Sequence, residues 1–533
     1  MSETLSALLR ERVAASGDAF SLIDEFESVT FAELEARVEH VAAGLSECGI
    51  GKGDAIAIWL PNWCAWIELQ FAVGRLGATA IALNTRFQRY EVEDIVARSR
   101  ARLLVLSSDF ELTNVRDVLN SVRSEALAGV HTIVDVRADG LIDERLLGLT
   151  DRVIPYRQLR EIEAPLEDAA DETDVCSVFT SSGTTSRPKL VAHPQRGVVV
   201  HARAVARAMG YDQPGTVFLG MLPVCGVFGF NGVMGALAGG APSVLLPSFD
   251  GPRAIEAIER HGATHTHGPD EMYRRLFAAF GERPKCGRLR YGGFANFSGD
   301  PAVLARLAES HGVSLYGVYG SSEVQALVTC QPLDADLARR SVMGGLPVSS
   351  ETRIRVRHPD TGETCNVGEP GDLEISGPSV MAEYLYDEEA TRAAFTDDGY
   401  FRTGDLAKLM PEGGIAFLNR RGDAIRLAGF LVSPREIERY LEEMPEIRTA
   451  QVVATETPKG FAAVAFVIVS GNAELDEAEV IRRCRAALAK YKVPKRVIAL
   501  DAYPTTPSPN GEKIQRVRLR EMAGDILASA PPR

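Results

Sequence analysis

The amino-acid sequence predicts an α/β fold, with a large N-terminal domain of mixed sheets and helices followed by a small α+β C-terminal domain. The first observation is that strand-like apolar runs alternate with helical patterns from the start of the chain. The second is the length, because 533 residues allow roughly two to four domains at about 150 residues each. The third is a composition of 45% apolar and 24% charged residues, which is typical of globular proteins.

Three apolar runs in the N-terminal part predict strands, at residues 54–60, 101–108 and 242–249. A helix is predicted to begin after Thr30, which can form a capping box with Glu33, and apolar residues follow at helical spacing as far as Leu45. Glycines recur every third residue from Gly226 to Gly235. Because no GxGxxG motif is present, we interpret them as close-packing positions and turns.

The C-terminal part begins with a predicted helix, for which Ser433 supplies the N-cap, Pro434 the first turn and Glu436 the capping-box acid. Two apolar strands are predicted near 450–454 and 462–469, and a second helix follows them. The next segment, YPTTPSPNGEK, contains three prolines and an Asn-Gly pair. We therefore expect an exposed, irregular loop that presents its last residue, Lys513, on a mobile arm.

Charge and cysteine usage exclude several classes of protein. The formal net charge of −14 would repel nucleic acid and anionic lipid. The eight cysteines are spread singly, which predicts a reducing, cytoplasmic location rather than a disulfide framework or structural zinc site. The N-terminus lacks the apolar core of a signal peptide. Residues 213–249 carry no charge, but eight glycines and four prolines interrupt them, so we expect burial and no membrane span.

The segment FTSSGTTSRPK, residues 179–189, predicts a phosphate-binding loop. Small residues let backbone N–H groups curl around an anion, hydroxyls add donors and a lysine supplies positive charge. It is not a Walker A loop, because GxxxxGK[ST] does not occur in the chain. Taken alone, the segment is equally compatible with a solvated Ser/Thr loop. The candidate phosphate-binding residues are Thr180, Ser181, Ser182, Gly183, Thr184, Thr185 and Lys189.

Further motifs follow in order: YGSSE (319–323), YFRTGDL (400–406), LNRRGDAIRLAGFLVSPREIE (418–438) and PNGEKIQR (509–516). Together with the hydroxyl-rich loop, they resemble the adenylate-forming superfamily of acyl-CoA synthetases, peptide adenylation domains and luciferases. The resemblance covers nearly the whole chain and is strongest to the acyl-CoA synthetases. It implies that the hydroxyl-rich loop holds the β- and γ-phosphates of ATP.

The resemblance also implies roles for other residues. Glu323 resembles the carboxylate that holds Mg²⁺ and takes part in catalysis, and Lys513 the lysine that brings the substrate carboxylate and the α-phosphate together. Glu512 looks like an extra residue relative to the family pattern, so the alignment of Lys513 with the family's lysine stays open. The resemblance further implies which residues bind ATP or AMP. Tyr319 is expected to stack on adenine, and Asp405 and Arg420 are expected to bind the ribose. The full set is Tyr319, Gly320, Ser322, Asp405 and Arg420.

The same resemblance places a hinge at Gly422, where the family usually has Asp or Lys, and divides the chain into domains 1–421 and 422–533. The C-terminal domain is expected to move between two orientations, one for each half-reaction. The segment Ala428, Gly429 and Phe430 is expected to approach the thiol of coenzyme A. Ser186, Ser322 and Asn419 are mild departures from the family pattern.

The acyl pocket is expected to be lined by Cys225, Gly226, Phe228, Gly292, Gly293 and Phe294. The family often has an aromatic residue and a histidine at the first two of these positions, so their loss suggests a roomier pocket and puts the thioester step in some doubt. Because these segments carry no charge, a bulky apolar or aromatic monocarboxylate fits better than a dicarboxylate. A zinc site at His261, His265 and His267 and a nucleophilic Cys225 are the less favoured alternatives.

These observations predict an AMP-forming carboxylic acid:CoA ligase that uses ATP, Mg²⁺ and coenzyme A. The alternative is an enzyme that makes the acyl adenylate and passes it to a carrier protein or a separate ligase in trans. A third class, a nucleotide-binding or zinc-binding protein without catalysis, is disfavoured because Glu323, Asp405, Arg420 and Lys513 are all present.

Overall fold

The computed structural model describes residues 2–529 except 111–114, 138, 182–187, 284, 297–300, 359–360, 421–424, 429, 433, 458–459, 472 and 509–510. The chain forms two compact units. The larger contains Met1–Thr85, Glu93–Ser181 and Leu190–Asn419, and the smaller contains Arg86–Val92, Ser182–Lys189 and Arg420–Arg533. The expected boundary between residues 421 and 422 lies outside the described residues and stays a prediction. None of the described helices has the length and hydropathy of a transmembrane segment.

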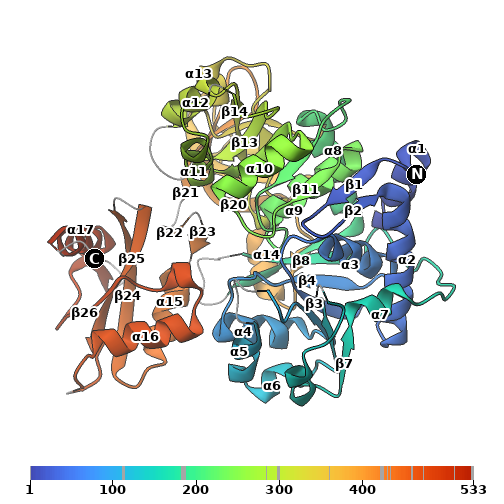
Figure 1. The fold of residues 1–533 in the computed structure, drawn as a ribbon. Coiled ribbons are helices and arrows are strands. Elements are labelled where there is room, and N and C mark those ends of the chain that lie inside the picture. Colours follow the sequence, from blue (N-terminus) through green and yellow to red (C-terminus); the bar gives the residue numbers. More distant parts are fainter. Residues whose placement is uncertain are drawn as a thin grey trace. The chain divides into compact units, whose positions relative to one another are not determined.

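A thirteen-stranded sheet forms one layer of the larger unit (Figure 1). In spatial order its strands are β17 (Arg353–Arg357), β18 (Pro370–Ser376), β20 (Phe401–Leu409), β21 (Ile415–Arg420), β16 (Gly344–Pro347), β15 (Thr329–Cys330), β14 (Ser314–Tyr319), β13 (Tyr291–Ala295), β12 (His265–Pro269), β10 (Phe218–Gly220), β11 (Ser243–Leu245), β1 (Phe20–Ile23) and β2 (Ser28–Thr30). The strands from β14 to β10 are parallel. Their carboxyl ends therefore meet at one edge.

An eight-stranded sheet forms a second layer. In spatial order its strands are β19 (Glu383–Tyr384), β9 (Lys189–Pro194), β8 (Val175–Ser181), β4 (Thr79–Ala82), β3 (Ala55–Trp59), β5 (Leu103–Leu106), β6 (Thr132–Asp135) and β7 (Arg152–Pro155). Strands β3, β5 and β11 lie within the three apolar runs predicted from the sequence. The alternation of strands and helices in the sequence therefore gave the correct fold class.

Helices between the two sheets build the largest hydrophobic core. They are α1 (Leu5–Ser16), α2 (Phe31–Glu47), α3 (Cys64–Arg75), α8 (Gln195–Ala208) and α9 (Val227–Gly239). A second core lies on the other face of the thirteen-stranded sheet, under α10 (Gly251–His261), α11 (Asp270–Phe280) and α12 (Pro301–Ser310). The other helices before residue 420 are α4 (Arg89–Ser99), α5 (Val115–Ser121), α6 (Ser124–Leu127), α7 (Tyr156–Arg160), α13 (Leu337–Arg340) and α14 (Glu388–Ala394).

Local sequence signals explain two of the central helices. Thr30 and Glu33 make both hydrogen bonds of the capping box at the start of α2, as predicted. The uncharged stretch 213–249 supplies β10, α9 and β11 and lies largely in the core, which confirms the expected burial. A Cβ at Gly229 or Gly235 would lie 2.3 or 2.6 Å from a neighbouring atom, so these glycines are close-packing positions.

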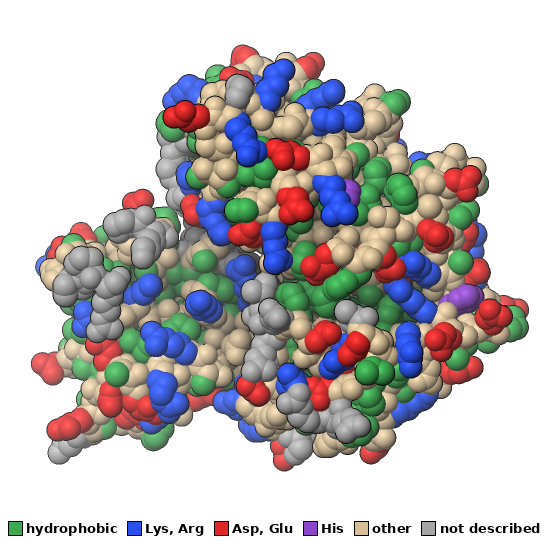
Figure 2. All heavy atoms as spheres, in the orientation of Figure 1, with side chains coloured by type: hydrophobic (Ala, Val, Ile, Leu, Met, Phe, Trp, Pro, Cys, Tyr) green, Lys and Arg blue, Asp and Glu red, His purple; other side chains and the backbone are tan. Residues whose placement is uncertain are grey.

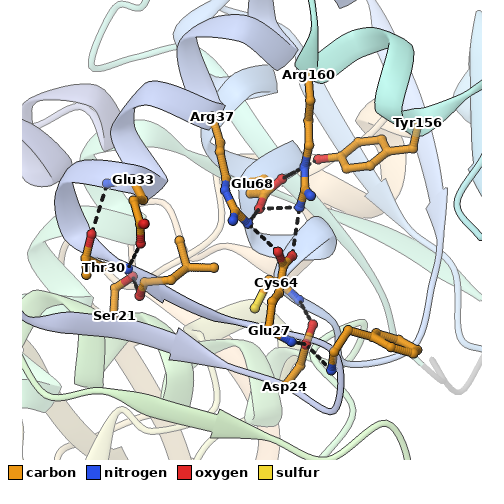
Figure 3. A network of polar contacts seen from close by, with 12 residues as sticks. Ser21, Asp24, Glu27, Thr30, Glu33, Arg37, Cys64, Glu68, Tyr156 and Arg160 are labelled. Atoms are coloured by element: carbon orange, nitrogen blue, oxygen red, sulfur yellow. Dashed lines mark hydrogen bonds and ion pairs between the residues drawn. The ribbon is translucent and has the colours of Figure 1, made fainter. Parts of the chain in front are cut away.

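A buried ionic cluster joins α2, α3 and α7 (Figure 3). The Glu68 carboxylate is fully buried and accepts hydrogen bonds from Arg37 at 3.1 Å, Arg160 at 2.7 and 2.9 Å, and Tyr156 at 2.8 Å. Glu27 pairs with the same two arginines at 2.8 and 3.0 Å. Both oxygens of Glu68 therefore have donors, and two carboxylates balance two guanidinium groups.

The smaller unit is α+β, as predicted. Its strands are β22 (Ile425–Leu427), β23 (Phe430–Val432), β24 (Ile447–Thr457), β25 (Gly460–Val469), β26 (Arg496–Ala499), β27 (Thr505–Ser508) and β28 (Gly511–Ile514). Its helices are α15 (Pro434–Glu442), α16 (Glu477–Ala487) and α17 (Arg516–Ser529). The prediction of an irregular loop before Lys513 was wrong, because strands β27 and β28 pair antiparallel there, with Thr506 opposite Lys513.

Figure 2 shows Lys and Arg side chains interspersed with Asp and Glu on the visible face of the protein. The formal net charge of the chain is −14.

Candidate active site

The candidate site lies where the parallel strands of the thirteen-stranded sheet end. Tyr319 is the last residue of β14, and Gly320 begins the turn that follows. In α/β sheets, ligands bind outside the carboxyl ends of the parallel strands. The YGSSE motif therefore occupies the position at which this sheet is expected to bind its ligand.

The turn after β14 folds back tightly on itself. A Cβ at position 320 would lie 1.5 Å from the carbonyl oxygen of Ala326, so only glycine fits there. The Ala326 N–H donates to the Ser321 carbonyl at 2.8 Å, and Gln325 and Ala326 both have φ of +58°. Non-glycine residues in this region of φ are strained, and such strain is concentrated at functional sites.

The turn places Glu323 in a short 3₁₀ segment, η2 (Ser322–Val324), where its side chain is almost fully buried. Tyr384 of β19 donates its hydroxyl to Glu323 Oε1 at 3.1 Å. Burial lowers the pKa of His193 to about 4, so its neutral ring can donate from Nε2 to the Ser322 carbonyl at 2.8 Å. Both contacts come from the eight-stranded sheet and orient the carboxylate.

A second contact joins two of the predicted motifs. The hydroxyl of Tyr319 donates to Asp405 Oδ2 at 2.7 Å, although the two residues are 86 positions apart. The ring of Tyr319 also stacks on Phe417 of β21, with a centroid distance of 5.4 Å. The YGSSE and YFRTGDL motifs therefore meet at one place, and the adenine- and ribose-binding roles of these residues stay predictions.

Several polar atoms around this turn are buried without a hydrogen-bond partner among the described residues. They are Ser181 Oγ, His193 Nδ1, Ser321 Oγ and both amide atoms of Gln325. Buried polar groups in folded proteins are almost always paired. Unpaired atoms beside a strained turn are what a site for a polar ligand would leave when the ligand is not present.

The residues around Glu323 fit a magnesium ion. Mg²⁺ is usually held by one or two carboxylates together with the phosphates of the substrate, and Glu323 is a buried carboxylate at the predicted phosphate end of the site. A different close group of possible metal ligands, Asp24, Glu27 and Cys64, is explained by structural contacts. Asp24 accepts three backbone N–H bonds, and burial raises the pKa of the Cys64 thiol.

The structure describes the phosphate-binding loop only in part. Thr180 and Ser181 end β8, and Lys189 begins β9. Ser182, Gly183, Thr184 and Thr185 lie outside the described residues, as do Gly422 and Gly429. Arg420 ends β21, Phe430 begins β23 and Lys513 lies in β28, but their side chains are not described. The roles of all these residues stay predictions.

The structure corrects part of the expected acyl pocket. Gly293 of β13 lies on the sheet face that looks towards α9, as its register partners His267 and Tyr316 do. Gly292 and Phe294 lie on the opposite face, because successive residues of a strand alternate between faces. A Cβ at Gly292 would meet Tyr273 at 2.5 Å, and Phe294 is buried in the core under α10 to α12. The apolar run YGGFA gave no alternation from which the face could be predicted.

The other pocket candidates lie at the start of α9. Gly226 is the N-cap of this helix, Phe228 lies in its first turn and Cys225 precedes it, buried in the main core. The ring of Phe228 stacks on His267, with centroids 5.8 Å apart. Cys225, Gly226, Phe228 and Gly293 therefore remain the predicted pocket residues.

The histidine cluster does not form a metal site in the part of the chain that the structure describes. His261 ends α10, whereas His265 and His267 share one face of β12. His265 Nδ1 is 2.8 Å from the Thr264 hydroxyl, and His267 Nε2 is 2.6 Å from the hydroxyl of Tyr211. Each ring is therefore bound to a neighbouring hydroxyl.

Sequence reasoning missed Tyr384, His193 and Phe417 as partners of the site. Tyr384 lies between the YGSSE and YFRTGDL motifs and belongs to neither, so no motif drew attention to it. His193 follows the phosphate-binding loop by four residues and carries no motif that distinguishes it from a core histidine.

The fold and the site together define an adenylate-forming enzyme. A family description for AMP-binding enzymes matches residues 9–385, and one for the C-terminal domain of the same enzymes matches residues 436–509. The chain belongs to this AMP-binding enzyme family.

Known proteins agree with this assignment. The mitochondrial medium-chain acyl-CoA ligase ACSF2 of Danio rerio is 29% identical over 518 residues, covering 92% of this chain and 83% of the relative. A structure of o-succinylbenzoate CoA synthetase from Bacillus subtilis is 25% identical with a TM-score of 0.79, covering 96% of this chain and 98% of the other. The amide bond synthetase McbA from Marinactinospora thermotolerans is 26% identical with a TM-score of 0.81, covering 98% and 100%.

Proposed function

We propose that this protein is an AMP-forming carboxylic acid:CoA ligase that activates an apolar acyl or aryl carboxylate. The observation that carries the proposal is the strained turn after β14, which holds the buried Glu323 carboxylate next to the contact between Tyr319 and Asp405. The two CoA-forming relatives described above support coenzyme A as the acceptor.

In the first half-reaction, a carboxylate oxygen of the acid attacks the α-phosphorus of ATP, and pyrophosphate leaves. The acid is already ionised at neutral pH, so the chain does not have to supply a base. Glu323 is the residue that would hold Mg²⁺, which neutralises the charge of the phosphates when bound. Asp405 and Tyr319 would orient the nucleoside, and Lys513 would draw the carboxylate and the α-phosphate together.

In the second half-reaction, the thiol of coenzyme A attacks the acyl carbon, the bond to the phosphate oxygen breaks and AMP leaves. The predicted hinge at Gly422 would bring the segment 428–430 to the thiol side. The carrier-protein acceptor remains the alternative, and the amide bond synthetase among the structural relatives is a reason to test amines as well. A cytoplasmic location remains part of the proposal.

The substrate class follows from the walls of the predicted pocket. Phe228 in the first turn of α9 and Gly293 in β13, two of the predicted pocket residues, are uncharged. A second carboxylate there would lack a cationic partner, which makes a monocarboxylate the better fit.

The test is pyrophosphate release over a panel of apolar and aromatic monocarboxylates, followed by mass spectrometry of the products with coenzyme A, with simple amines and with neither. We expect acid-dependent pyrophosphate release and a CoA thioester. Glu323→Gln should lower the rate by ~10²-fold or more, because a preorganised charge at the phosphates is lost. Glu351→Gln, which changes an exposed carboxylate paired with Arg196, is the matched control and should keep the activity.

Two results would overturn the proposal. Pyrophosphate release that does not depend on any acid, or that is unchanged in Glu323→Gln, would remove the adenylation step. Acyl adenylate that forms with a broad panel of acids but never reacts with coenzyme A would replace the ligase by the carrier-protein or amine alternative.

A further inference from the structure

A buried asparagine joins helix α9 to the turn after β14. Asn231 is 0% exposed, and its Nδ2 donates to the carbonyl oxygen of Val227 and to that of Gln325, each at 3.1 Å. Because both partners are carbonyl oxygens, the NH₂ side of the amide faces them, and each of its two hydrogens binds one carbonyl. The amide is therefore fixed to its own helix and holds a residue of the turn that is 94 positions away in the sequence.

The bound carbonyl belongs to the strained part of the turn. Gln325 and the next residue, Ala326, both have φ of +58°, in the left-handed region that is unfavourable for residues other than glycine. Such a conformation persists only where the surrounding structure holds it. Gln325 follows Glu323 by two residues, so a turn that relaxed towards ordinary φ values would move the Glu323 carboxylate.

The rest of the turn is held in the same way from other elements. His193 of β9 donates to the Ser322 carbonyl at 2.8 Å, and the backbone N–H of Met381 donates to the Glu323 carbonyl at 2.8 Å. Asn231 binds further along the turn than these two contacts do. Contacts from three elements therefore fix the backbone on both sides of the carboxylate.

Stability alone does not explain an amide at this position. The oxygen of Asn231, Oδ1, is buried without a partner among the described residues, and such an atom lowers stability. Both carbonyls also have a second donor. The Gln325 carbonyl accepts the N–H of Leu327 at 2.6 Å, and the Val227 carbonyl lies in a helix, where it accepts the N–H four residues later. An apolar side chain of the same size would therefore cost the fold little.

We propose that Asn231 is a positioning residue, whose amide fixes the turn after β14 and with it the carboxylate of Glu323. The proposal rests on the proposed function and deepens it, because it adds a residue that determines how well Glu323 could hold Mg²⁺. Asn231 acts through the backbone of Gln325 rather than through contact with a ligand. Removing a group that orients a metal ligand typically lowers metal affinity or activity by ~10–100-fold.

The experiment measures by calorimetry how tightly ATP binds when no acid is present, once with Mg²⁺ and once with EDTA. The dissociation constant in EDTA divided by that in Mg²⁺, the metal ratio, gives the contribution of the metal. Glu323→Gln should remove most of this contribution, and Asn231→Leu should lower the metal ratio ~10-fold. The dissociation constant in EDTA should stay nearly unchanged in Asn231→Leu, whereas general damage to the site would weaken ATP binding under both conditions.

A second variant, Asn231→Ser, separates the two hydrogen bonds of the amide. A serine hydroxyl in a helix can donate to the carbonyl four residues earlier, so the bond to Val227 is kept and the bond to Gln325 is lost. The metal ratio should fall as far as in Asn231→Leu, by ~10-fold.

The matched control is Gln70→Leu. Gln70 in α3 is fully buried, donates to the carbonyl of Cys176 in β8 at 3.1 Å, and has an amide oxygen without a partner among the described residues. Its partner lies in a regular strand rather than in a strained turn. The midpoint of urea unfolding should shift by similar amounts in Gln70→Leu and Asn231→Leu, but Gln70→Leu should keep the metal ratio of wild type.

The results separate this proposal from the proposed function. If both Asn231 variants keep the wild-type metal ratio, or if Gln70→Leu lowers it as much as they do, the positioning role is wrong and the ligase proposal stands. If Glu323→Gln keeps the wild-type metal ratio, the metal-binding step of the proposed function fails and the positioning role fails with it. Asn231→Ser decides the question if Asn231→Leu does not fold.

Discussion

Two buried polar clusters in the larger unit differ in whether they are complete. Around Glu68, both carboxylate oxygens accept two hydrogen bonds each, and the charges of Glu27 and Glu68 balance those of Arg37 and Arg160 (Figure 3). Around His267 the groups are neutral, and one ring nitrogen has no partner among the described residues. The comparison teaches that the charged groups buried here are fully paired, whereas a neutral ring is buried with one nitrogen left unpaired.

The electrostatics of the two clusters are also opposite. Burial lowers the pKa of the Arg160 guanidinium, but Glu68, Tyr156 and Glu27 together outweigh burial and raise the pKa above its ordinary value. At His267, burial is not opposed by a carboxylate, and the pKa falls to about 3. The Arg160 guanidinium is therefore charged at moderate pH values, and the His267 ring is neutral.

The largest expected effect is on stability, at the complete cluster. Glu68→Ala would leave two largely buried guanidinium groups with only Glu27 between them. Removing one partner of a buried ion pair costs ~3–5 kcal/mol, and we expect the lower end because Glu27 remains. The free energy of unfolding in urea measures the loss. The control is Glu39→Ala, which removes an exposed partner of Arg75 and should lower the free energy of unfolding by less than ~1 kcal/mol. Equal losses in the two variants would show that the cluster around Glu68 does not stabilise the fold.

A smaller effect is expected from one hydroxyl of the same cluster. Tyr156→Phe removes the 2.8 Å hydrogen bond to Glu68 and keeps the ring in the core. A hydrogen bond to a charged group contributes ~1.5–3 kcal/mol, so urea unfolding should show a loss of about 2 kcal/mol. Tyr386→Phe, at an exposed ring, should show almost none. The rate of pyrophosphate release should not change in either variant, and a changed rate would contradict a purely structural role for the cluster around Glu68.

The smallest effect concerns the pH dependence of stability at His267. Its folded pKa of about 3 lies below the unfolded value of ~6.5, so the unfolded state binds more protons and stability falls as the pH drops below ~6.5. Between pH 8 and pH 5.5, protonation of this ring in the unfolded state should lower the free energy of unfolding by about 1 kcal/mol. His267→Gln should therefore lose about 1 kcal/mol less than wild type over this interval in urea unfolding. His358→Gln, at an exposed position, serves as the control, and an identical pH dependence in all three proteins would place His267 in contact with water.

The sequence predicted the parts of the fold and site that depend on local chemistry. The capping box of Thr30 and Glu33 and the strands β3, β5 and β11 followed from motifs and periodicity. That Tyr319 and Asp405 belong to one site was implied by the family resemblance, and the two side chains are in contact. The contact between Tyr384 and Glu323 could not be predicted, because it joins two sheets across 61 residues and depends on their packing. The same holds for the row of His267, Gly293 and Tyr316, because strand register is set by the whole sheet.

The central claim is that the site joins a carboxylate oxygen to the α-phosphorus of ATP and then transfers the acyl group to a thiol. The most direct measurement uses an acid whose carboxylate oxygens are heavy isotopes, with ATP and coenzyme A, and mass spectrometry of all products. The account predicts AMP that carries one heavy oxygen, unlabelled pyrophosphate and a thioester that keeps the other heavy oxygen. Unlabelled AMP, or heavy oxygen in inorganic phosphate beside ADP, would contradict it.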